Sequence, residues 1–277
     1  MMQKKVWFIT GCSTGFGRFI AKAAIEAGNQ VVVTARNRNA ILDFLHGNES
    51  KVLALELDVT NKEQVKKAIS DAIERFSRID VLVNNAGIGY FSSVEEGIEE
   101  ETRRMFEINF WGLMNVTNAV LPYMREQREG HIFNFSSIGG LASFPSLGYY
   151  HATKYAVEGI SESLSQEVAP FNIKVTLVEP SSFRTDWAGR SSIKTMPEID
   201  EYKTIIEPML AASGKGNEAG DPEKAAKAIM QIADSENPPL RILLGKAAYY
   251  VAANKFSDML KNIENWKDIT LNADYEV

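Results

Sequence analysis

The stretch that most constrains the fold is the N-terminal run, in which an apolar segment, three glycines and an amphipathic pattern follow one another. Residues 6–10 are predicted to form a buried strand, and the apolar spacing from Phe19 onward predicts a helix. Gly11, Gly15 and Gly17 lie between the two. A glycine-rich turn that opens a helix is typical of a phosphate-binding loop, because backbone N–H groups at a helix N-terminus attract anions. The spacing departs from G-x-G-x-x-G, but this context favours a nucleotide site over a simple glycine-rich loop.

Strand and helix patterns alternate along the rest of the chain. Further strands are predicted over residues 30–34, 52–57, 80–83, 131–135, 174–178 and 241–244. Helices are predicted over residues 62–76, 102–124 and 150–169, from 221 onward, and in the tail to about 266. This alternation is typical of a three-layer α/β structure, a doubly wound parallel sheet or Rossmann fold. We expect one domain over residues 1–277, in which residues 181–218 look irregular and form a mobile lid over the substrate site.

Composition limits the class of protein. The chain has 277 residues, of which 45% are hydrophobic and 24% charged, enough for one large α/β domain. A net charge of −6 argues against nucleic acid or an anionic membrane surface as a partner. The single cysteine, Cys12, cannot form an intrachain disulfide and fits a reducing compartment, and no run approaches the ~20 apolar residues of a membrane span. The histidines are scattered, so we expect no metal site. With no membrane span and an N-terminal apolar run too short for a signal-peptide core, we expect a cytoplasmic protein.

The end of the second predicted strand bears on the choice of nucleotide. An NAD site usually has an acidic residue there, which bonds the ribose 2′-hydroxyl. This chain has Ala35 at that point, followed by Arg36, whose guanidinium can pair with a 2′-phosphate. Arg36 could also be an ordinary surface arginine at the start of a loop. The missing carboxylate predicts NADP(H) as the cofactor, with NAD(H) the less favoured alternative.

Polar side chains that could perform chemistry lie on one helix and at the ends of strands. Tyr150 and Lys154 are one helical turn apart, and a fixed ammonium beside a phenol favours proton transfer near neutral pH. Alone, such a pair could equally be a solvated surface pair. Asn85 and Ser137 follow strands, and Asn109 interrupts an apolar helix, where it is either a satisfied core residue or a site residue. The chain lacks a G-x-S-x-G elbow, which disfavours a serine hydrolase.

These motifs, in this order, resemble the classical short-chain dehydrogenase/reductase family over nearly the whole chain. The matching stretches are Thr10–Gly17, Asp58-Val59, Asn84–Gly87, Asn109, Ser137, Tyr150-x-x-x-Lys154, and Glu179-Pro180 with Thr185. The amino-acid sequence of the glycine loop and the long C-terminal part are similar to those of the family branch that includes retinol and 17β-hydroxysteroid dehydrogenases. The resemblance implies a catalytic tetrad of Asn109, Ser137, Tyr150 and Lys154.

The resemblance also implies which residues hold the dinucleotide. Asp58 and Val59 would hold the adenine, Ser13 and Arg36 the 2′-phosphate, and Thr185 the nicotinamide carboxamide. The full set implied is Gly11, Ser13, Thr14, Gly15, Phe16, Gly17, Arg36, Asp58, Val59, Asn85, Ala86, Gly87, Tyr150, Lys154, Pro180 and Thr185. One departure concerns the loop after Pro180, where the family usually has glycine and this chain has Ser181 and Ser182. Serine lacks the backbone freedom of glycine, so the path of this loop is an open question.

The implied activity is NADP-dependent hydride transfer between the nicotinamide and a carbonyl or secondary alcohol. In it Tyr150 moves the proton, Lys154 lowers the Tyr150 pKa, Ser137 polarises the carbonyl, and Asn109 holds a water. The residues that we expect to line the substrate pocket are Ile88, Tyr90, Leu141, Phe144, Pro145, Trp187 and Met196. Their side chains suggest an apolar or aromatic ketone or aldehyde as the substrate.

Three further expectations concern two alternative functions and the assembly of subunits. A non-catalytic dinucleotide-binding sensor or scaffold is the main alternative, and a complete tetrad disfavours it. A sugar-nucleotide epimerase or dehydratase would have a different glycine spacing and a larger C-terminal domain. We also expect a homodimer or homotetramer, formed through the apolar face of the Met105–Met124 helix and through the Tyr150 helix.

Overall fold

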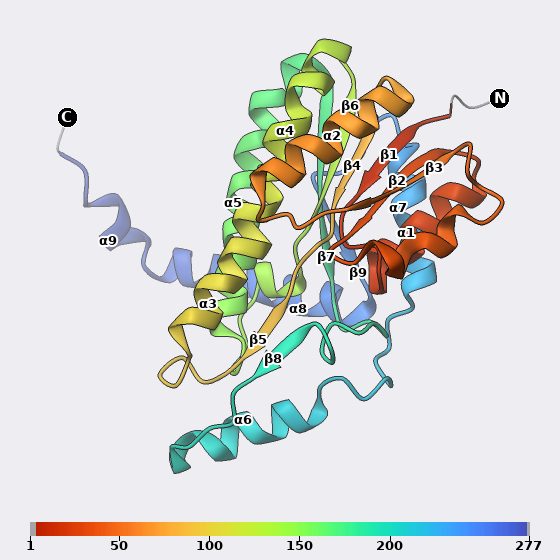
Figure 1. The fold of residues 1–277 in the computed structure, drawn as a ribbon. Coiled ribbons are helices and arrows are strands. Elements are labelled where there is room, and N and C mark those ends of the chain that lie inside the picture. Colours follow the sequence, from red (N-terminus) through yellow and green to blue (C-terminus); the bar gives the residue numbers. More distant parts are fainter. Residues whose placement is uncertain (1–3, 276–277) are drawn as a thin grey trace.

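The computed structural model describes residues 4–275 and has a parallel sheet at its centre (Figure 1). Its strand order is β3-β2-β1-β4-β6-β7-β9. The strands are β1 (Val6–Ile9), β2 (Gln30–Ala35), β3 (Val52–Glu56), β4 (Val81–Asn84), β6 (Gly130–Phe135), β7 (Ile173–Pro180) and β9 (Arg241–Leu244). The helices are α1 (Gly15–Glu26), α2 (Lys62–Phe76), α3 (Glu99–Phe106), α4 (Leu113–Gln127), α5 (Gly148–Val168), α6 (Asp200–Ala212), α7 (Pro222–Ala233), α8 (Lys246–Asn265) and α9 (Lys267–Leu271). The predicted doubly wound parallel sheet is confirmed.

Helices cover both faces of the sheet, and the strand sequences show why. Successive side chains of a strand point to opposite faces. In β1, Trp7 and Ile9 pack in the core with α1 and α7, whereas Val6 and Phe8 pack in the core with α2, α4 and α5. All four side chains are almost completely buried. A strand that is covered on both faces must be apolar throughout, which explains the continuous apolar run.

The strand order reverses beside β1, which pairs with β2 on one side and β4 on the other. In open parallel sheets a crevice for ligands lies at such a switch point, outside the carboxyl ends of the strands. Here the loops after β1 and β4 are held together, because the Asn85 side-chain nitrogen donates to the backbone oxygens of Thr10 and Gly11, at 2.9 and 3.1 Å. The topology thus brings the glycine loop and the Asn84–Gly87 stretch to one crevice.

Two segments differ from the sequence prediction. The helix expected over residues 102–124 is divided by a π-helical turn, Glu107–Gly112, which lies between α3 and α4 and contains Asn109. Residues 181–218 are not irregular throughout, since they contain α6 and the strand β8 (Ser192–Lys194), which pairs in parallel with β5 (Gly89–Phe91). Strands of three residues give too little periodicity to detect, and Pro208 inside α6 is a residue type that disfavours a helix interior.

The apolar face that we expected to join subunits is buried within the chain. Met105, Val116, Val120 and Met124 are fully buried, the last three in the core between the sheet, α2 and α5. That face is therefore not available to a second subunit, and the expected interface is wrong in this respect. Within residues 4–275, no helix is long and apolar enough to cross a membrane.

Candidate active site

Two adjoining cavities lie along the carboxyl edge of the sheet. The smaller, of about 160 Å³, follows β1, β2 and β4, and the larger, of about 550 Å³, lies between the sheet, α5 and α6. Five residues line both: Phe16, Asn85, Gly87, Thr185 and Trp187. The predicted cofactor residues that line the smaller cavity are Gly11, Ser13, Thr14, Gly15, Phe16, Arg36, Asp58, Val59, Asn85, Ala86, Gly87 and Thr185. Those that line the larger one besides the shared residues are Tyr150, Lys154 and Pro180, and Gly17 lines neither.

The glycine loop has the geometry of a phosphate cradle. Gly11 adopts a φ of 71°, which favours glycine, and a Cβ at Gly17 would lie 2.5 Å from both the Gly11 oxygen and the Asn85 side-chain nitrogen. Gly17 is thus required by packing rather than by contact with a ligand. Thr14 precedes α1, and its side chain makes no capping hydrogen bond with any described residue. The first N–H groups of α1 are therefore available to an anion at the edge of the smaller cavity.

The smaller cavity also fits the remaining parts of a dinucleotide. Ala35 ends β2, and Arg36 and Ser13 line the cavity beside it. One carboxylate oxygen of Asp58 accepts from the Thr60 backbone nitrogen at 2.9 Å and from its hydroxyl at 2.7 Å, which fixes the side chain. A Cβ at Gly15 would lie 3.5 Å from the Cβ of Thr185, so the two walls of the crevice are close together. The residues present fit a nicotinamide dinucleotide that extends from the smaller cavity into the larger.

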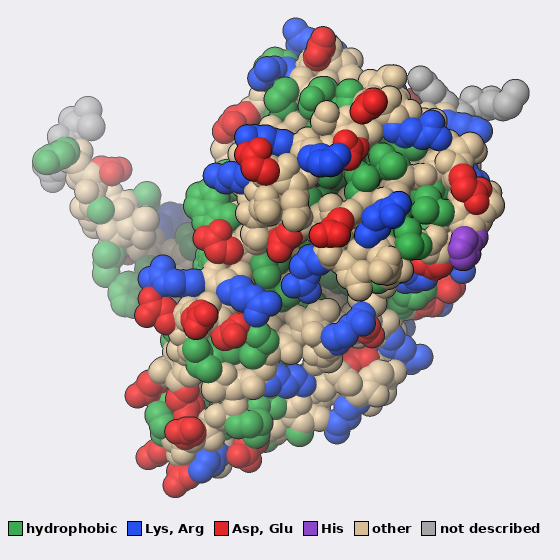
Figure 2. Space-filling model, in the orientation of Figure 1, with side chains coloured by type: hydrophobic (Ala, Val, Ile, Leu, Met, Phe, Trp, Pro, Cys, Tyr) green, Lys and Arg blue, Asp and Glu red, His purple; other side chains and the backbone are tan. Residues whose placement is uncertain are grey.

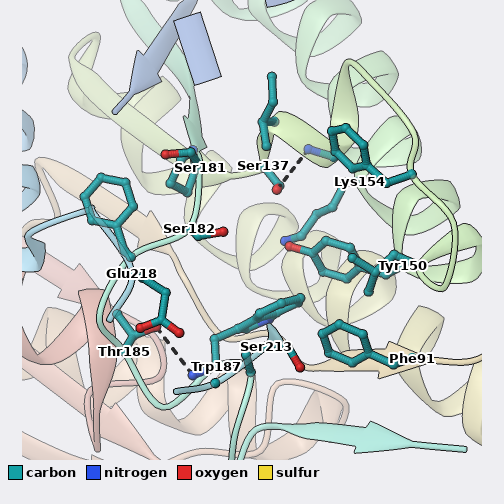
Figure 3. Close-up of a pocket in the computed structure, with 18 of the residues that line it drawn as sticks. Phe91, Ser137, Tyr150, Lys154, Ser181, Ser182, Thr185, Trp187, Ser213 and Glu218 are labelled. Carbon is teal, nitrogen blue, oxygen red and sulfur yellow. Dashed lines mark hydrogen bonds between the residues drawn. The ribbon is translucent and has the colours of Figure 1, made fainter. Parts of the chain in front are cut away.

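Ser137 lies at the end of β6, at the start of a 3₁₀ turn, Ile138–Gly140, and lines the larger cavity. Its hydroxyl oxygen accepts a hydrogen bond from the Gly139 backbone nitrogen at 3.0 Å. Because the oxygen is held as an acceptor, its own hydrogen can be donated to a group in the cavity. Figure 3 shows Ser137, Tyr150 and Lys154 around the same space, with this hydrogen bond as a dashed line.

Tyr150 and Lys154 both point from α5 into the larger cavity, as their spacing predicts (Figure 3). The Lys154 Nζ lies 5.7 Å from the centroid of the Tyr150 ring and donates to the Phe135 oxygen at 2.7 Å. Burial lowers the pKa of Lys154 to about 8, and the charge of Glu158 opposes this. Burial also raises the pKa of Tyr150, while a hydrogen bond with the Ser137 side chain lowers it. The expected net lowering of the Tyr150 pKa is not found, because the desolvation of the phenol dominates.

Asn109 lies behind the cavities rather than in them. Its side-chain oxygen accepts from the Ile88 backbone nitrogen at 2.8 Å, and its side-chain nitrogen donates to the Ile88 oxygen at 2.9 Å and to the Thr153 hydroxyl at 3.2 Å. The Thr153 hydroxyl in turn donates to the Tyr150 backbone oxygen at 2.8 Å. Asn109 therefore ties the loop after β4 to the helix of Tyr150, and both hydrogens of its amide are used in doing so.

The larger cavity is lined differently from our expectation. Phe144 and Trp187 line it, but Ile88 lines the smaller cavity. Tyr90 is a packing residue, 1% exposed, whose hydroxyl accepts from the Ile98 backbone nitrogen. Leu141, Pro145 and the 58% exposed Met196 line neither cavity. The lining residues that sequence reasoning missed include Phe91, Phe183, Pro208, Met209 and Glu218, and no local motif marks them.

The loop after Pro180 does not need the glycine that is usual there. Ser181 and Ser182 both have negative φ, so neither residue requires glycine's freedom. The Ser181 backbone nitrogen donates to the Leu244 oxygen at 2.9 Å. Its side chain occupies the space where a Cβ at Gly245 would be, 2.4 Å from the Ser181 hydroxyl oxygen. Gly245, with a φ of 94°, makes room for the serine, and this resolves the open question about the path of the loop.

A buried charged cluster lies behind Lys154, and sequence reasoning missed it. The Arg241 Nε donates to a Glu158 oxygen at 3.0 Å and lies 3.6 Å from a Glu179 oxygen. Burial, followed by the charge of Glu158, raises the pKa of Glu179 to about 8. Glu179 was noticed only as part of a strand-end motif, and the i,i+4 step from Lys154 to Glu158 was the one signal that could have located the cluster.

Comparisons with known proteins agree with this geometry. The model of the short chain dehydrogenase family matches residues 5–195. The 3-ketodihydrosphingosine reductase of Bacteroides thetaiotaomicron is 38% identical over 264 residues, covering 95% of this chain and 96% of that protein. A short-chain dehydrogenase from Streptomyces avermitilis has a crystal structure that is similar with a TM-score of 0.92 and 38% identity, covering 99% of this chain and 100% of that one.

Two more distant structures contain nicotinamide cofactors. The alcohol dehydrogenase of Thermococcus sibiricus, solved with 5-hydroxy-NADP, is 26% identical with a TM-score of 0.72, covering 87% of this chain and 96% of that one. The 3-ketoacyl-(acyl-carrier-protein) reductase of Brucella melitensis, solved with NADH, is 25% identical with a TM-score of 0.74, covering 88% and 97%. From the family match, the fold and the two cavities, the chain belongs to the short-chain dehydrogenase family and is an oxidoreductase that uses a nicotinamide cofactor.

Proposed function

We propose that this protein is an NADP-dependent reductase of apolar or aromatic ketones or aldehydes, acting also in reverse on the corresponding alcohols. The observation that carries the proposal is the placement of Ser137, Tyr150 and Lys154 on one cavity that shares five lining residues with the glycine-loop cavity. A non-catalytic sensor would have no need of these three side chains around one space. The similarity to the retinol and 17β-hydroxysteroid dehydrogenase branch stays a prediction.

The catalytic side chains are suited to protonating a carbonyl oxygen. Because burial raises the pKa of Tyr150, its hydroxyl keeps its proton at neutral pH and can donate it to a developing alkoxide. The Ser137 hydroxyl donates a hydrogen bond to the same oxygen as charge builds there. Lys154 would bond the nicotinamide ribose, and its ammonium favours the phenolate that forms once the proton has left. When bound, the cofactor supplies or accepts the hydride.

The lining of the larger cavity supports an apolar substrate. The cavity that Tyr150 lines is also lined by the apolar side chains of Phe91, Phe144, Trp187 and Met209. Apolar pockets with a few placed polar groups bind mainly by the burial of hydrophobic surface. The Bacteroides relative is named as a reductase of 3-ketodihydrosphingosine, which agrees with a ketone that carries an apolar body.

We propose that residues 181–218 act as the lid over this cavity. Pro208 and Met209 of α6 line the larger cavity, and Figure 1 shows α6 below the sheet at a distance from the other helices. Glu96 ties the start of α6 to the body, because one of its oxygens accepts from the backbone nitrogens of Glu198 and Ile199 at 2.7 and 2.9 Å. A segment held at defined points and lining the substrate space is suited to closing over a bound substrate.

The preference for NADP(H) rests on Arg36, with Ser13 beside it. A charge-assisted hydrogen bond to the 2′-phosphate is worth ~1.5–3 kcal/mol, or about ten- to hundred-fold in affinity. We expect Arg36→Ala to erase most of a preference for NADPH over NADH, and Ala35→Asp to shift it toward NADH. Arg125→Ala is the matched control, since Arg125 is an exposed arginine on α4 that lines neither cavity.

The test is to titrate NADPH and NADH into the wild type and these variants, and to follow NADPH oxidation with a panel of ketones and aldehydes. A wild type that prefers NADH, or an Arg36→Ala variant with an unchanged ratio, contradicts the NADP assignment. No oxidation with any carbonyl of the panel contradicts the proposed activity.

A further inference from the structure

The C-terminal helix α8 leaves the body of the protein, and α9 continues it outward (Figure 1). Only Ala248 and Ala252 of α8 are buried, and every residue from 253 to 275 is exposed. We call residues 253–271 the C-terminal arm. An isolated helix of this length is only marginally stable in water, because most helical stability in proteins comes from packing an apolar face.

The C-terminal arm carries such a face. Five large apolar side chains form one stripe along the helix: Phe256, Met259, Leu260, Ile263 and Trp266. At ~100° of rotation per residue, each of them points within about 60° of their mean direction. Their exposed fractions are 49%, 46%, 66%, 56% and 58%. Figure 2 shows hydrophobic side chains at the surface of this projecting segment. A continuous stripe of this kind is unusual on a surface that meets only water.

The stripe continues the face that α8 already buries. Ala248 and Ala252 point in the same direction along the helix as Met259 and Ile263, and they are 0% and 2% exposed against the body. Beyond Ala252 the body ends, and the same face has no further surface of the described chain to cover it. A partner that covered the stripe would lie beside this body, at the point where the helix leaves it.

We propose that the occupant is a second copy of this chain, related by a two-fold axis, so that each C-terminal arm packs its stripe on the partner. A two-fold axis places the same surface of both copies in contact and lets each arm extend the other's core. This assigns a subunit interface different from the helices that the sequence suggested.

The area available is sufficient for a stable dimer. Large aromatic side chains bury ~150–250 Å² each, so five half-exposed large side chains offer roughly 400–700 Å² per arm. Each copy also contributes the surface that the partner's arm covers, which brings the total per copy to about the ~800 Å² of a standard interface.

The charges on the arm favour a protein partner of this kind over a membrane. The arm carries Lys255, Lys261 and Lys267 together with Asp258, Glu264 and Asp268, so its charges balance. Lys261 pairs with Asp258, and Lys267 with Glu264, each at 3.2 Å. Helices that lie on anionic membranes are instead rich in lysine and arginine on the polar face. Two neutral arms can approach each other without repulsion.

The test compares two double variants by sedimentation equilibrium at micromolar concentration. Phe256→Lys with Ile263→Lys places two charges in the stripe, and Asn254→Lys with Asn265→Lys places the same charges on the opposite side of α8. We expect the assembly mass of the stripe variant to fall to half that of the wild type, while the control variant keeps the wild-type mass. Circular dichroism and NADPH binding, which should be unchanged in both, establish that the body is folded.

Several results would overturn the proposal. One is a wild type that is monomeric, and another is a stripe variant with the mass of the wild type. A third is an equal loss of mass in both variants, which would show that charge rather than the stripe is responsible. Flotation with vesicles of phosphatidylcholine and phosphatidylserine in equal parts gives the fourth: binding that the stripe variant loses while its mass is unchanged would assign the C-terminal arm to a membrane.

Discussion

The two cavities are built in different ways, although they share one wall. The smaller is formed by the loops that follow β1, β2 and β4, and by short side chains that leave the backbone accessible, such as Gly11, Ala35 and Ala86. The larger is formed by bulky side chains from distant parts of the chain, such as Phe91 and Met209. The first depends on backbone geometry, which restricts the amino acid at each position. The second depends on apolar surface, which many residues can supply, so it is the part of the site that can change with the substrate.

The comparison predicts that the two cavities can be disabled separately, and the largest effect is expected at Tyr150. Tyr150 lines only the larger cavity. Tyr150→Phe removes the proton donor and keeps the ring, so turnover should fall by at least ~10²-fold, the contribution of a general acid. The dissociation constant of NADPH should stay close to that of the wild type, because the glycine loop is untouched. Steady-state kinetics and a fluorescence titration of NADPH measure the two quantities.

Tyr149→Phe is the matched control for this experiment. Tyr149 is the preceding residue, and its hydroxyl donates to the Val94 oxygen at 3.0 Å, away from the cavity. Turnover should be close to normal in this variant. If Tyr150→Phe retained normal turnover with a carbonyl substrate, the assignment of Tyr150 as proton donor would be wrong.

A smaller effect, confined to the larger cavity, is expected from Glu96. Its carboxylate accepts from the Glu198 and Ile199 backbone nitrogens and from the Ser93 hydroxyl, at 2.7, 2.9 and 2.6 Å. The Ser93 hydrogen bond, followed by the one from Ile199, lowers the pKa of Glu96, which shows that these contacts favour the charged form. Glu96→Gln weakens the attachment of α6, and we expect the KM of the carbonyl substrate to rise by roughly three- to tenfold, the scale of one hydrogen bond.

The KM of NADPH should not change in Glu96→Gln, because the smaller cavity contains no part of α6. Glu99→Gln is the control: Glu99 pairs with Arg103 on the surface of α3, and exposed pairs of this kind contribute little. Equal changes in the KM of substrate and cofactor would mean that α6 is not specific to the larger cavity.

The same contrast explains how much could be predicted from the sequence. Gly11 and Gly17 were recognised because a φ of 71° and a gap too narrow for a Cβ exclude nearly every other residue. Ser137, Tyr150 and Lys154, which the structure brings to one cavity, could be proposed as site residues because chemistry restricts their type and, for Tyr150 and Lys154, the helix restricts their spacing. The seven strands of the central sheet were predicted because buried strands of a parallel sheet consist mainly of apolar residues.

The rest depended on tertiary contacts that leave no local pattern. Met196 and Met209 are equally apolar in sequence, yet only Met209 lines the larger cavity, because α6 rather than the preceding loop turns toward it. Tyr90 was taken for a pocket residue, but its hydroxyl is used by Ile98 and Thr195. The raised pKa of Tyr150 could not be predicted either, because burial is a property of the whole fold.

The smallest effect we expect tests whether a buried carboxyl behind the larger cavity is protonated in the folded protein. Glu179 lies in β7 behind this cavity, 1% exposed, and burial raises its pKa from 4.5 to about 8 in the folded protein. Between these two values the folded chain binds a proton that the unfolded chain has released. The stability that this group contributes is therefore complete below pH ~4.5 and is lost as the pH rises toward about 8.

Glu179→Gln replaces the protonated carboxyl by a neutral amide that cannot titrate. We expect the melting temperature of the variant, relative to the wild type, to increase as the pH is raised from about 5 to about 8, by ~2–4 °C, the response of a chain of this size to ~1 kcal/mol. Glu158 and Arg241 face Glu179, and burial raises the pKa of Glu158 as well, so both carboxyls act in the same direction. Lys154, whose pKa is lowered to about 8, changes stability only above this pH range.

Glu162→Gln is the control, because Glu162 is an exposed partner of the same Arg241, at 2.6 Å. If melting temperatures measured by calorimetry differ from the wild type by the same amount at both pH values in Glu179→Gln, Glu179 does not bind a proton in the folded protein over this pH range, and the raised pKa is wrong.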